Sequence, residues 1–468
     1  MRPSSQPGAD PGLREPPVPP DLALHTDHYE LTMLDAVLTS GVVGHQAVFE
    51  VFARSLPGGR RYGVLAGTDR VVRALSAFRF DPDTLSWLRH QRIVSAAAQE
   101  WLSRYRFHGS IDGYPEGEVY LPGSPVLTVR GTFAEALLLE TFVLSVLNFD
   151  SAVATAASRL VMAAAGRRLV EMGSRRTHEE AGVAAARSAY LAGFAASANL
   201  AAGRRYGVPT TGTAAHAFTL AHRDEAAAFA AQVATLGTGT TLLVDTYDVA
   251  EAVRRAVAAA GPQLGAVRID SGDLAASARA VRAQLDGLGA TGTTIVATGD
   301  LDETKIAGLV DAGAPIDAFG VGTSLVSGPW CPSPGFIYKL VAVADRPGAD
   351  APLRPVAKRS EGKETVGGAK SAFRRVADGQ ASAELIIVDD RSRPLEQLHG
   401  LPSELAARPL QVPLVRHGQP VGHLSAPQAL DRARRHLQTA LAELPEVALA
   451  LTPGEAALPV EQHLLARP

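Results

Sequence analysis

VRIDSGDLAASARAVRAQLDGLGATGTTIVATGD, residues 267–300, contains the pattern that decides the fold. A short apolar run ends in a polar loop, an alanine-rich helical segment follows, and a second apolar run ends in another polar loop. The same alternation extends from about Arg167 to Ser327. Polar or glycine-rich residues follow six apolar runs in this region, at 171–176, 211–216, 244–248, 268–273, 297–300 and 319–324.

Such alternation predicts parallel strands joined by crossover helices, and therefore an α/β fold. Strand ends that all carry polar groups favour a βα barrel, because the reactive face of a barrel lies at the carboxyl ends of its strands. A doubly wound open sheet is the alternative.

The regions on either side differ in composition and in the pattern of apolar residues. Residues 1–20 are rich in proline, glycine and serine, and we expect a flexible tail there. Residues 46–54 alternate in polarity like a strand. We expect four segments, namely the tail at 1–20, an N-terminal α/β part at 21–132, the barrel domain at 133–330, and a C-terminal segment at 331–468 that packs on the N-terminal part.

Two local patterns stand out in the N-terminal part. Asp27 and Glu30 are three residues apart, which predicts an N-cap and N3 pairing at the start of a helix, and Gly41 is placed to end that helix. Residues 118–121 and 126–129 predict the two strands of a hairpin around a Pro-Gly-Ser turn.

The composition excludes several classes of protein. With 468 residues, 46% hydrophobic and 20% charged, the chain can bury a large core. The formal net charge of −3 offers no basic field for a nucleic acid or a membrane surface. The single cysteine, Cys331, excludes an intramolecular disulfide and a cysteine-based zinc cluster.

Neither a signal peptide nor a membrane span is predicted. The first twenty residues lack the apolar core of a signal peptide. Charged side chains interrupt the most apolar helical stretch, 134–165, at Glu135, Glu140, Asp150 and Arg159. We therefore expect a cytoplasmic protein with no membrane partner and no nucleic-acid partner.

The polar loops suggest chemistry, although each has a structural alternative. The run from Gly320 to Ser324 offers backbone N–H groups and hydroxyls at a helix start, which suits a phosphate group, and a tight turn is the alternative. Arg268 and Asp270 are two residues apart on a strand, so both point to the same face. They could form a structural ion pair, or Arg268 could bind a carboxylate while Asp270 holds a sugar hydroxyl.

His216 and the adjacent pair Arg175 and Arg176 are ambiguous one by one. A lone histidine is more often structural or solvated, and two adjacent arginines usually belong to a solvated surface. Here all three share the expected rim with the glycine loops. The combination suits a phosphorylated sugar substrate better than an apolar one.

Six ordered motifs resemble those of the nicotinate phosphoribosyltransferases, over roughly residues 22 to 375. The motifs are Thr26-Asp27-x-Tyr29-x-Leu31-Thr32-Met33, Phe49-Glu50-x-Phe52-x-Arg54, Glu171-x-Gly173-Ser174-Arg175-Arg176, Gly212-Thr213-x-Ala215-His216, Arg268-Ile269-Asp270-Ser271-Gly272-Asp273 and Gly320-Val321-Gly322-Thr323.

This resemblance implies a type II phosphoribosyltransferase fold, with an α/β sandwich-like domain built from N- and C-terminal segments and joined to an irregular βα barrel. It implies that nicotinate and phosphoribosyl pyrophosphate give nicotinate mononucleotide and pyrophosphate, in NAD biosynthesis or salvage. It further implies coupled ATP hydrolysis through a phosphohistidine, a requirement for Mg²⁺ (Mn²⁺ being possible), and a homodimer with shared active sites.

The resemblance also implies roles for single residues. Tyr29 would stack on the pyridine ring from the partner subunit, and Thr213 and Arg268 would contact nicotinate. His216 would be phosphorylated, and Asp270 would hold the ribose region as a second catalytic residue. The phosphoribosyl group and its phosphates would be held by Ser174, Arg175, Arg176, Gly299, Asp300, Gly322 and Thr323. The family commonly has Ser where Ala217 follows His216, so ATP coupling could be weaker here.

Four other functions compete with this interpretation. Nicotinamide phosphoribosyltransferase would need a hydrogen-bond acceptor for the amide, and residues 212–216 contain no acid. Quinolinate phosphoribosyltransferases are much shorter chains. A catalytically inactive ligand-binding protein would not need His216, Arg268 and Asp270 together. A phosphosugar lyase would need a Schiff-base lysine at a strand end, and none of the six strand ends has one.

Overall fold

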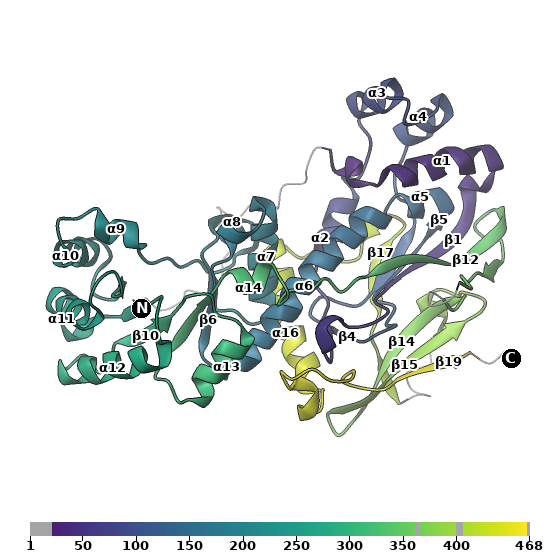
Figure 1. Ribbon diagram of the computed structural model, residues 1–468. Helices are drawn as coiled ribbons and strands as arrows, with labels where there is room; N and C mark the ends of the chain where they lie inside the picture. The colour runs from purple at the N-terminus through teal and green to yellow at the C-terminus, as the bar shows by residue number, and fades with distance from the viewer. Residues whose placement is uncertain (1–20, 361–364, 399–405, 466–468) are drawn as a thin grey trace. The chain divides into compact units, whose positions relative to one another are not determined.

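The computed structural model describes residues 21–360, 365–398 and 406–465. Contacts between Cα atoms divide the chain into two compact units. The first, here called the barrel unit, comprises Ala156–Pro332. The second, here called the sandwich unit, comprises the described residues up to Thr155 together with those from Ser333 onward (Figure 1).

The barrel unit contains a sheet of six parallel strands in the order β7-β6-β11-β10-β9-β8. Their bounds are β6 Arg168–Glu171, β7 Ala196–Ser197, β8 Thr241–Leu243, β9 Ala266–Ile269, β10 Thr294–Ala297 and β11 Ala318–Val321. Buried apolar residues such as Leu242, Val267, Ile295 and Phe319 form its core.

The strand order distinguishes the two predicted topologies. From β8 to β11 each strand pairs with the next in sequence, β11 pairs with β6, and β6 pairs with β7. This is the cyclic order of a barrel that is open between β7 and β8. A doubly wound sheet would instead reverse its direction of growth at a switch point. The predicted α/β fold with an irregular βα barrel is therefore confirmed.

One predicted strand is wrong. The run before residue 211 forms only a single parallel bridge, between Thr210 and Ser197. The strand at that place in the barrel order is β7, which has two residues and is too short to show a period in the sequence.

Helices follow the strands, and α10, α11 and α12 lie side by side (Figure 1). Their bounds are α7 Glu179–Leu191, α8 Leu200–Tyr206, α9 His216–Leu220, α10 Glu225–Leu236, α11 Val249–Ala260, α12 Leu274–Gly287, α13 Glu303–Asp311 and α14 Thr323–Val326. Side-chain caps start five of them, at Asn199, Asp224, Asp248, Asp273 and Asp302.

The long apolar helix α6, Glu140–Ala164, runs through the division between the units. By length and composition the stretch Phe133–Ala164 could cross a membrane, and 67% of its most apolar window is buried inside the protein. Burial of this kind is typical of a core helix.

The sandwich unit is built from both ends of the chain. Its seven-stranded sheet has the order β13-β12-β1-β5-β3-β17-β18, and a four-stranded sheet has the order β16-β14-β15-β19. The N-terminal strand β1 pairs with the C-terminal strand β12, and β3 pairs with β17. The predicted sandwich-like domain from N- and C-terminal segments is therefore confirmed.

The strands of this unit are β1 His45–Phe52, β2 Gly63–Val64, β3 Ser110–Gly113, β4 Val119–Tyr120, β5 Leu127–Thr132, β12 Ile337–Pro347, β13 Leu353–Pro355, β14 Ala369–Ala377, β15 Gln380–Asp389, β16 Ala407–Pro409, β17 Val412–Arg416, β18 Gln419–Pro420 and β19 Val460–Leu464. Its other helices are α1 His28–Ser40, α2 Thr68–Leu75, α3 Pro82–His90, α4 Ala96–Ser103, α5 Phe133–Leu137 and α16 Ala426–Ala442.

Two local predictions in this unit are wrong. The segments at 118–121 and 126–129 do not form a hairpin, because β4 pairs with β2 while β5 pairs with β1 and β3. Helix α1 begins after Asp27 and ends at Gly41 as predicted, but Asp27 makes no side-chain cap. The buried carboxylate of Glu30 instead accepts hydrogen bonds from Thr26 and Thr141.

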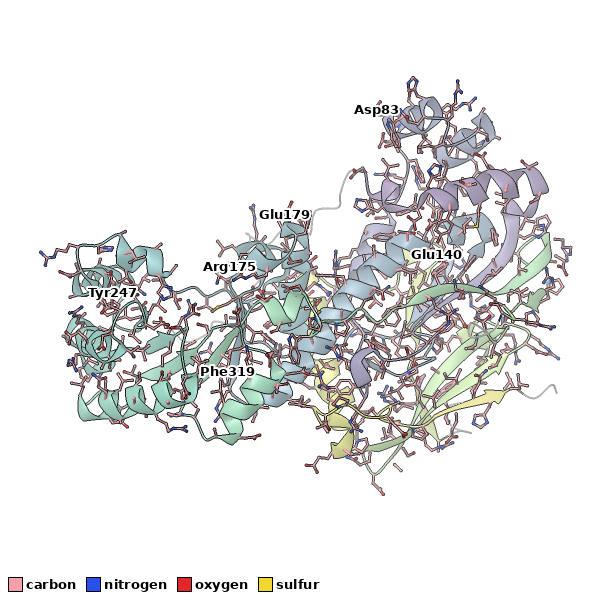
Figure 2. The ribbon with its side chains drawn as sticks, in the orientation of Figure 1. Asp83, Glu140, Arg175, Glu179, Tyr247 and Phe319 are labelled. Atoms are coloured by element: carbon pink, nitrogen blue, oxygen red, sulfur yellow. The ribbon has the colours of Figure 1, made fainter. Side chains whose placement is uncertain are left out.

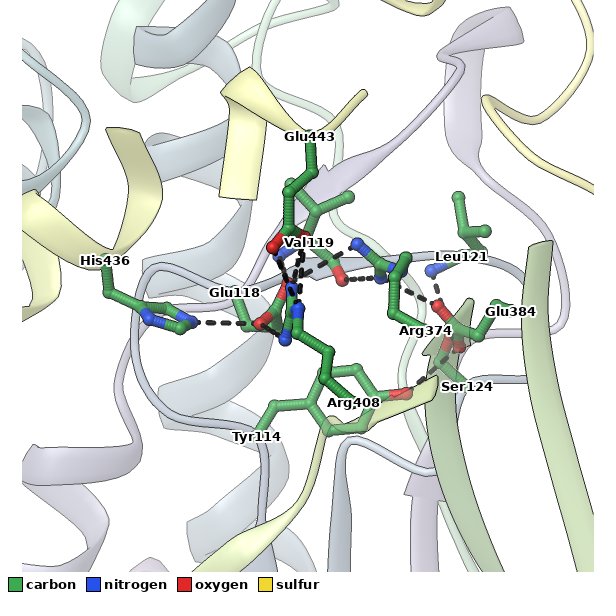
Figure 3. A network of polar contacts seen from close by, with 10 residues as sticks. All are labelled: Tyr114, Glu118, Val119, Leu121, Ser124, Arg374, Glu384, Arg408, His436 and Glu443. Atoms are coloured by element: carbon green, nitrogen blue, oxygen red, sulfur yellow. Dashed lines mark hydrogen bonds and ion pairs between the residues drawn. The ribbon is translucent and has the colours of Figure 1, made fainter. Parts of the chain in front are cut away.

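A buried polar network joins the two ends of the chain in the sandwich unit (Figure 3). The fully buried carboxylate of Glu118, next to β4, accepts hydrogen bonds at 2.9 Å from Arg408 on β16 and from His436 on α16. Arg374 on β14 contacts Glu118 at 3.5 Å and donates to Glu384 on β15 at 2.9 Å. Elements far apart in sequence are therefore connected through one carboxylate.

Candidate active site

The residues that follow β6, β8, β9, β10 and β11 lie on one rim of the barrel unit. Parallel strands place all their carboxyl ends at the same edge of the sheet. Figure 2 labels Arg175 after β6 and Tyr247 after β8, and it also labels Phe319, which lies within β11. The rim therefore gathers most of the side chains singled out in the sequence.

The guanidinium of Arg268 on β9 is the centre of this rim. Its Nε donates to Thr298 Oγ1 at 2.8 Å, one terminal nitrogen donates to Thr213 Oγ1 at 3.1 Å, and the other lies 2.8 Å from Asp270 Oδ1. The Arg268 side chain is 11% exposed, so its orientation is fixed by these partners rather than by solvent. Two of the predicted nicotinate-binding residues, Thr213 and Arg268, are therefore in direct contact.

Asp270 is both a member of an ion pair and accessible from the rim. Its side chain is 31% exposed and also accepts a hydrogen bond from Thr298. Partial burial raises the pKa of Asp270, but the hydrogen bonds from Thr298 and Arg268 and the charge of Arg268 outweigh burial and hold the pKa below its ordinary value. Asp270 is therefore an anion at neutral pH, next to a fixed cation.

Asp245, which follows β8, was not assigned a role from the sequence. Its side chain is 3% exposed and lies 3.2 Å from His216 Nε2. It also accepts hydrogen bonds from the Asp270 backbone N–H at 2.9 Å and from Ser271 Oγ at 2.7 Å. The signal that could have identified it is positional, because Asp245 follows β8 closely, as Asp270 follows β9.

His216 is the first residue of the short helix α9 and has a side chain that is 41% exposed. Only Nε2 has a protein partner, Asp245, and within the ranges that the structure describes Nδ1 has none. One ring nitrogen is thus oriented by a buried carboxylate while the other remains available to a ligand.

The loop after β10 adopts an unusual backbone. Gly299 has φ +105°, and an added Cβ would lie 2.2 Å from the carbonyl oxygen of Asp270. The next residue, Asp300, also has a positive φ of 46°, and its carbonyl oxygen accepts a hydrogen bond from Lys305 Nζ at 2.7 Å. Two consecutive left-handed residues turn the backbone sharply where a phosphate group was predicted.

The loops after β6 and β11 pack against each other. An added Cβ on Gly320 would lie 2.5 Å from Thr298 and 2.8 Å from the Met172 sulfur, and one on Gly322 would lie 3.1 Å from the Met172 carbonyl oxygen. Thr323 begins α14 directly after Gly322. The predicted phosphate-binding loops are therefore neighbours. Thr298 connects them to Arg268, because it lies close to Gly320 and accepts a hydrogen bond from Arg268.

The 3-10 turn η4, Ser174–Arg176, holds the other three predicted phosphate-binding residues. Ser174 Oγ accepts a hydrogen bond from Asn199 Nδ2 at 2.9 Å, whereas the side chains of Arg175 and Arg176 are exposed. An exposed pair of guanidinium groups on an ordered turn can bind the oxygens of a phosphate or pyrophosphate.

Tyr29 lies elsewhere, on α1 of the sandwich unit, and its side chain is 45% exposed. Partial burial and the nearby charge of Glu140 raise the pKa of Tyr29 above its ordinary value, so its hydroxyl stays protonated. Its predicted place in the partner subunit's pocket stays a prediction, as do the ligand roles of the other site residues.

The expected requirement for Mg²⁺ stays a prediction. Among the described residues no group of three or more His, Cys, Asp or Glu side chains could hold a metal ion. Mg²⁺ is commonly bound by one or two carboxylates together with substrate phosphates, rather than by a cage of protein ligands. Asp270, beside Arg268, and the exposed Asp300, in the loop after β10, are two carboxylates of this rim.

Comparisons with known proteins point to one family. Residues 24–148 match the nicotinate phosphoribosyltransferase (NAPRTase) N-terminal domain family. The chain is 54% identical over 445 residues to nicotinate phosphoribosyltransferase pncB1 of Mycobacterium tuberculosis, covering 93% of this chain and 94% of that protein. It is 34% identical to the Bacillus subtilis nicotinate phosphoribosyltransferase, covering 78% and 75%.

The fold agrees as well. The crystal structure of human nicotinic acid phosphoribosyltransferase superposes with a TM-score of 0.75 at 25% identity, covering 94% of this chain and 97% of that chain. The Pyrococcus furiosus nicotinate-nucleotide pyrophosphorylase structure has a TM-score of 0.71 at 24% identity, covering 90% and 97%, and shows a shared fold. The chain belongs to the nicotinate phosphoribosyltransferase family.

Proposed function

We propose that this chain joins nicotinate to phosphoribosyl pyrophosphate, giving nicotinate mononucleotide and pyrophosphate, and that it couples this reaction to ATP hydrolysis. The observation that carries the proposal is the Arg268 guanidinium, fixed by Thr213, Thr298 and Asp270 on the same rim as two glycine loops and an exposed arginine pair. A carboxylate, a sugar and phosphate groups each find a complementary partner there.

Arg268 would recognise the carboxylate of nicotinate. A planar guanidinium binds a carboxylate through two parallel hydrogen bonds, and Thr213 adds a hydroxyl on the same side. Residues 212–216 contain no acid that could accept hydrogen bonds from an amide. Nicotinate is therefore favoured over nicotinamide.

The chemical step would be a displacement at the anomeric carbon of the sugar. The pyridine nitrogen attacks this carbon, a carbon–nitrogen bond forms, and the bond to the pyrophosphate oxygen breaks, so pyrophosphate leaves with the electron pair. Fixing both reactants in line supplies most of the acceleration. Arg175 and Arg176 would bind the departing charge, and Mg²⁺ or Mn²⁺ would enter with the pyrophosphate group of the substrate.

ATP would be coupled through His216. With a proton on Nε2 facing Asp245, Nδ1 carries the lone pair. Attack of Nδ1 on the γ-phosphorus forms a phosphorus–nitrogen bond and releases ADP, and later hydrolysis by water returns histidine and inorganic phosphate. The added negative charge would pair with Arg175 or Arg176 and tighten the binding of phosphoribosyl pyrophosphate.

Product identification tests the substrate. Purified protein is offered nicotinate, nicotinamide and quinolinate side by side with phosphoribosyl pyrophosphate and Mg²⁺. We expect nicotinate mononucleotide as the main product. Equal turnover of nicotinamide would refute the assignment of the substrate.

Labelling tests the phosphohistidine. γ-Labelled ATP should give an acid-labile, base-stable label that maps to His216, and His216→Ala should abolish ATP hydrolysis yet keep slow synthesis with a raised KM for phosphoribosyl pyrophosphate. His222→Ala is the matched control, because His222 is exposed and, among the described residues, its ring contacts just the Phe218 carbonyl oxygen and the Phe218 ring. Label on another residue, or full ATP stimulation in His216→Ala, would refute this coupling.

The assembly and location follow from the same proposal. We propose a homodimer in the cytoplasm in which Tyr29 of one subunit completes the site of the other. ATP, nicotinate and phosphoribosyl pyrophosphate are its small-molecule partners.

A further inference from the structure

Glu171, the last residue of β6, has a side chain that is completely buried behind the predicted phosphate loop. Unlike Glu118, it has no cationic partner in the part of the chain that the structure describes. Its two oxygens accept hydrogen bonds from the Gly173 backbone N–H and from Ser197 Oγ. A buried carboxylate without a cation is unfavourable unless hydrogen-bond donors are fixed around it. These two contacts therefore fix the orientation of the Glu171 side chain and of its two donors.

The contacts of Glu171 return to the same loop by a second route. Ser197 Oγ accepts a hydrogen bond from the Asn199 backbone N–H at 2.8 Å. The Asn199 side chain donates to Ser174 Oγ at 2.9 Å while its oxygen caps α8. One carboxylate therefore fixes Gly173 directly, and Ser174 through Ser197 and Asn199.

Packing leaves this loop little freedom in other directions. An added Cβ on Gly173 would lie 2.6 Å from a methyl carbon of Val326 on α14, and one on Gly182 of α7 would lie 3.3 Å from the Ser174 Cα atom. The Arg176 backbone N–H donates to the Gly173 carbonyl oxygen at 2.8 Å and closes the turn. The backbone is thus held from behind while the two arginine side chains project outward.

We propose that Glu171 is a positioning residue that preorganises the Ser174–Arg176 turn to bind the phosphate groups of phosphoribosyl pyrophosphate. This inference rests on the proposed function. When the turn is already ordered before binding, the protein loses less backbone entropy as the ligand binds. The gain is roughly a factor of ten in affinity for each residue that binding would otherwise have to order. Among the described residues, no hydrogen bond joins this network to the Arg268 cluster, so we expect the effect to be selective.

Variants at Glu171 test the selectivity. Glu171→Ala should raise the KM for phosphoribosyl pyrophosphate roughly tenfold or more, with less than about threefold change in the KM for nicotinate. Glu171→Gln keeps an acceptor for Gly173 and a group that can reach Ser197, and should stay within about threefold of wild type. Glu225→Ala is the matched control, because Glu225 is a buried carboxylate, 1% exposed, on α10 of the same unit and pairs with Arg255.

A second variant decides the case if Glu171→Ala does not fold. Asn199→Ser keeps a side chain that can cap α8 but is too short to reach Ser174, so it breaks only the second route. It should raise the KM for phosphoribosyl pyrophosphate at unchanged melting temperature. Equal rises in both KM values, or no change in Asn199→Ser, would overturn the role of Glu171.

The two proposals fail in different ways. A wild-type chain that forms no nicotinate mononucleotide would refute the proposed function alone. Calorimetry with inorganic pyrophosphate and Mg²⁺ would then test whether the Ser174–Arg176 turn binds phosphate groups and depends on its hydrogen bonds to do so. Weaker binding by Asn199→Ser than by wild type would support the positioning role, and equal affinity would overturn it.

Discussion

Arg268 makes three contacts with three different nitrogens, and this geometry gives the first prediction. Lysine has one charged nitrogen and cannot contact Thr213, Thr298 and Asp270 while also binding a carboxylate side-on. We expect Arg268→Lys to raise the KM for nicotinate by roughly 10- to 100-fold, the value of a charged hydrogen bond of about 1.5–3 kcal/mol.

Steady-state kinetics with each substrate varied in turn would check this. Arg279→Lys is a suitable control, since Arg279 lies on α12 and, within the described ranges, its side chain donates to the Ala312 carbonyl oxygen alone. A parallel rise in the KM for phosphoribosyl pyrophosphate in Arg268→Lys would show that Arg268 supports the whole rim rather than nicotinate.

For single residues, the sequence predicts a side-chain contact well where the two residues are close in the chain as well as in space. Arg268 and Asp270 share a strand face, so their contact could be expected from the spacing. The contact between Asp245 and His216 joins residues 29 positions apart, across the ends of two separate segments. Its position after β8 marks Asp245 as a residue of the rim, but only the fold shows that it faces His216.

The same limit holds for elements. The barrel was predictable because apolar runs, polar loops and capped helices recur in a fixed order. The hairpin was not, because alternation shows that 118–121 and 126–129 can be strands but not which strands they meet. Between them, the buried hydroxyl of Ser124 donates to Glu384 on β15, so a distant contact fixes the turn instead of pairing between β4 and β5.

The β10–α13 loop gives a prediction at the scale of elements. Gly299→Ala would combine a left-handed φ of +105° with a Cβ that lies 2.2 Å from the Asp270 carbonyl oxygen. The backbone strain alone is about 1–3 kcal/mol, and relief of the clash must move Asp270 or the loop. We expect a lower melting temperature and at least a tenfold loss of kcat/KM.

Gly289→Ala separates strain from crowding. Gly289 has φ +77° in the turn after α12, and no atom lies within 4 Å of its added Cβ. It should lose about 1–2 kcal/mol of stability and retain full activity. Equal activity in the two variants would mean that the close approach of Gly299 to Asp270 is not needed at the site.

At the scale of the molecule, the Glu118 network should make the free energy of unfolding depend on pH in the acid range (Figure 3). Burial raises the pKa of Glu118, but hydrogen bonds from His436 and Arg408 and the charges of Arg374 and Arg408 outweigh it and lower the pKa to about 2. A carboxylate with a depressed pKa stabilises the fold above its ordinary pKa of 4.5, and this contribution is lost as the pH falls toward 2. The shift corresponds to roughly 3 kcal/mol.

Glu118→Gln should therefore be clearly less stable than wild type at pH 7, and the difference in melting temperature should narrow between pH 4.5 and pH 2. Glu100→Gln is the control, because it breaks an ion pair with Arg104 whose side chains are 72% and 73% exposed, and it should melt like wild type. A difference that stays constant with pH would mean that charge at Glu118 contributes nothing.

The last prediction concerns the assembly. The barrel rim and Tyr29 belong to different units of the chain, and the proposed dimer assigns them to one site contributed by two subunits. Tyr29→Ala and Asp270→Ala should each be nearly inactive alone. In a heterodimer of the two, one site carries both lesions and the other carries neither, so mixed and reassembled chains should recover up to about a quarter of wild-type activity.

Mixing Tyr29→Ala with Arg268→Ala should recover activity equally, whereas Asp270→Ala with Arg268→Ala should recover none because both lesions lie on the same rim. Mass spectrometry of the intact assembly would establish that heterodimers are present. Full heterodimer formation without recovered activity would place Tyr29 outside the shared site.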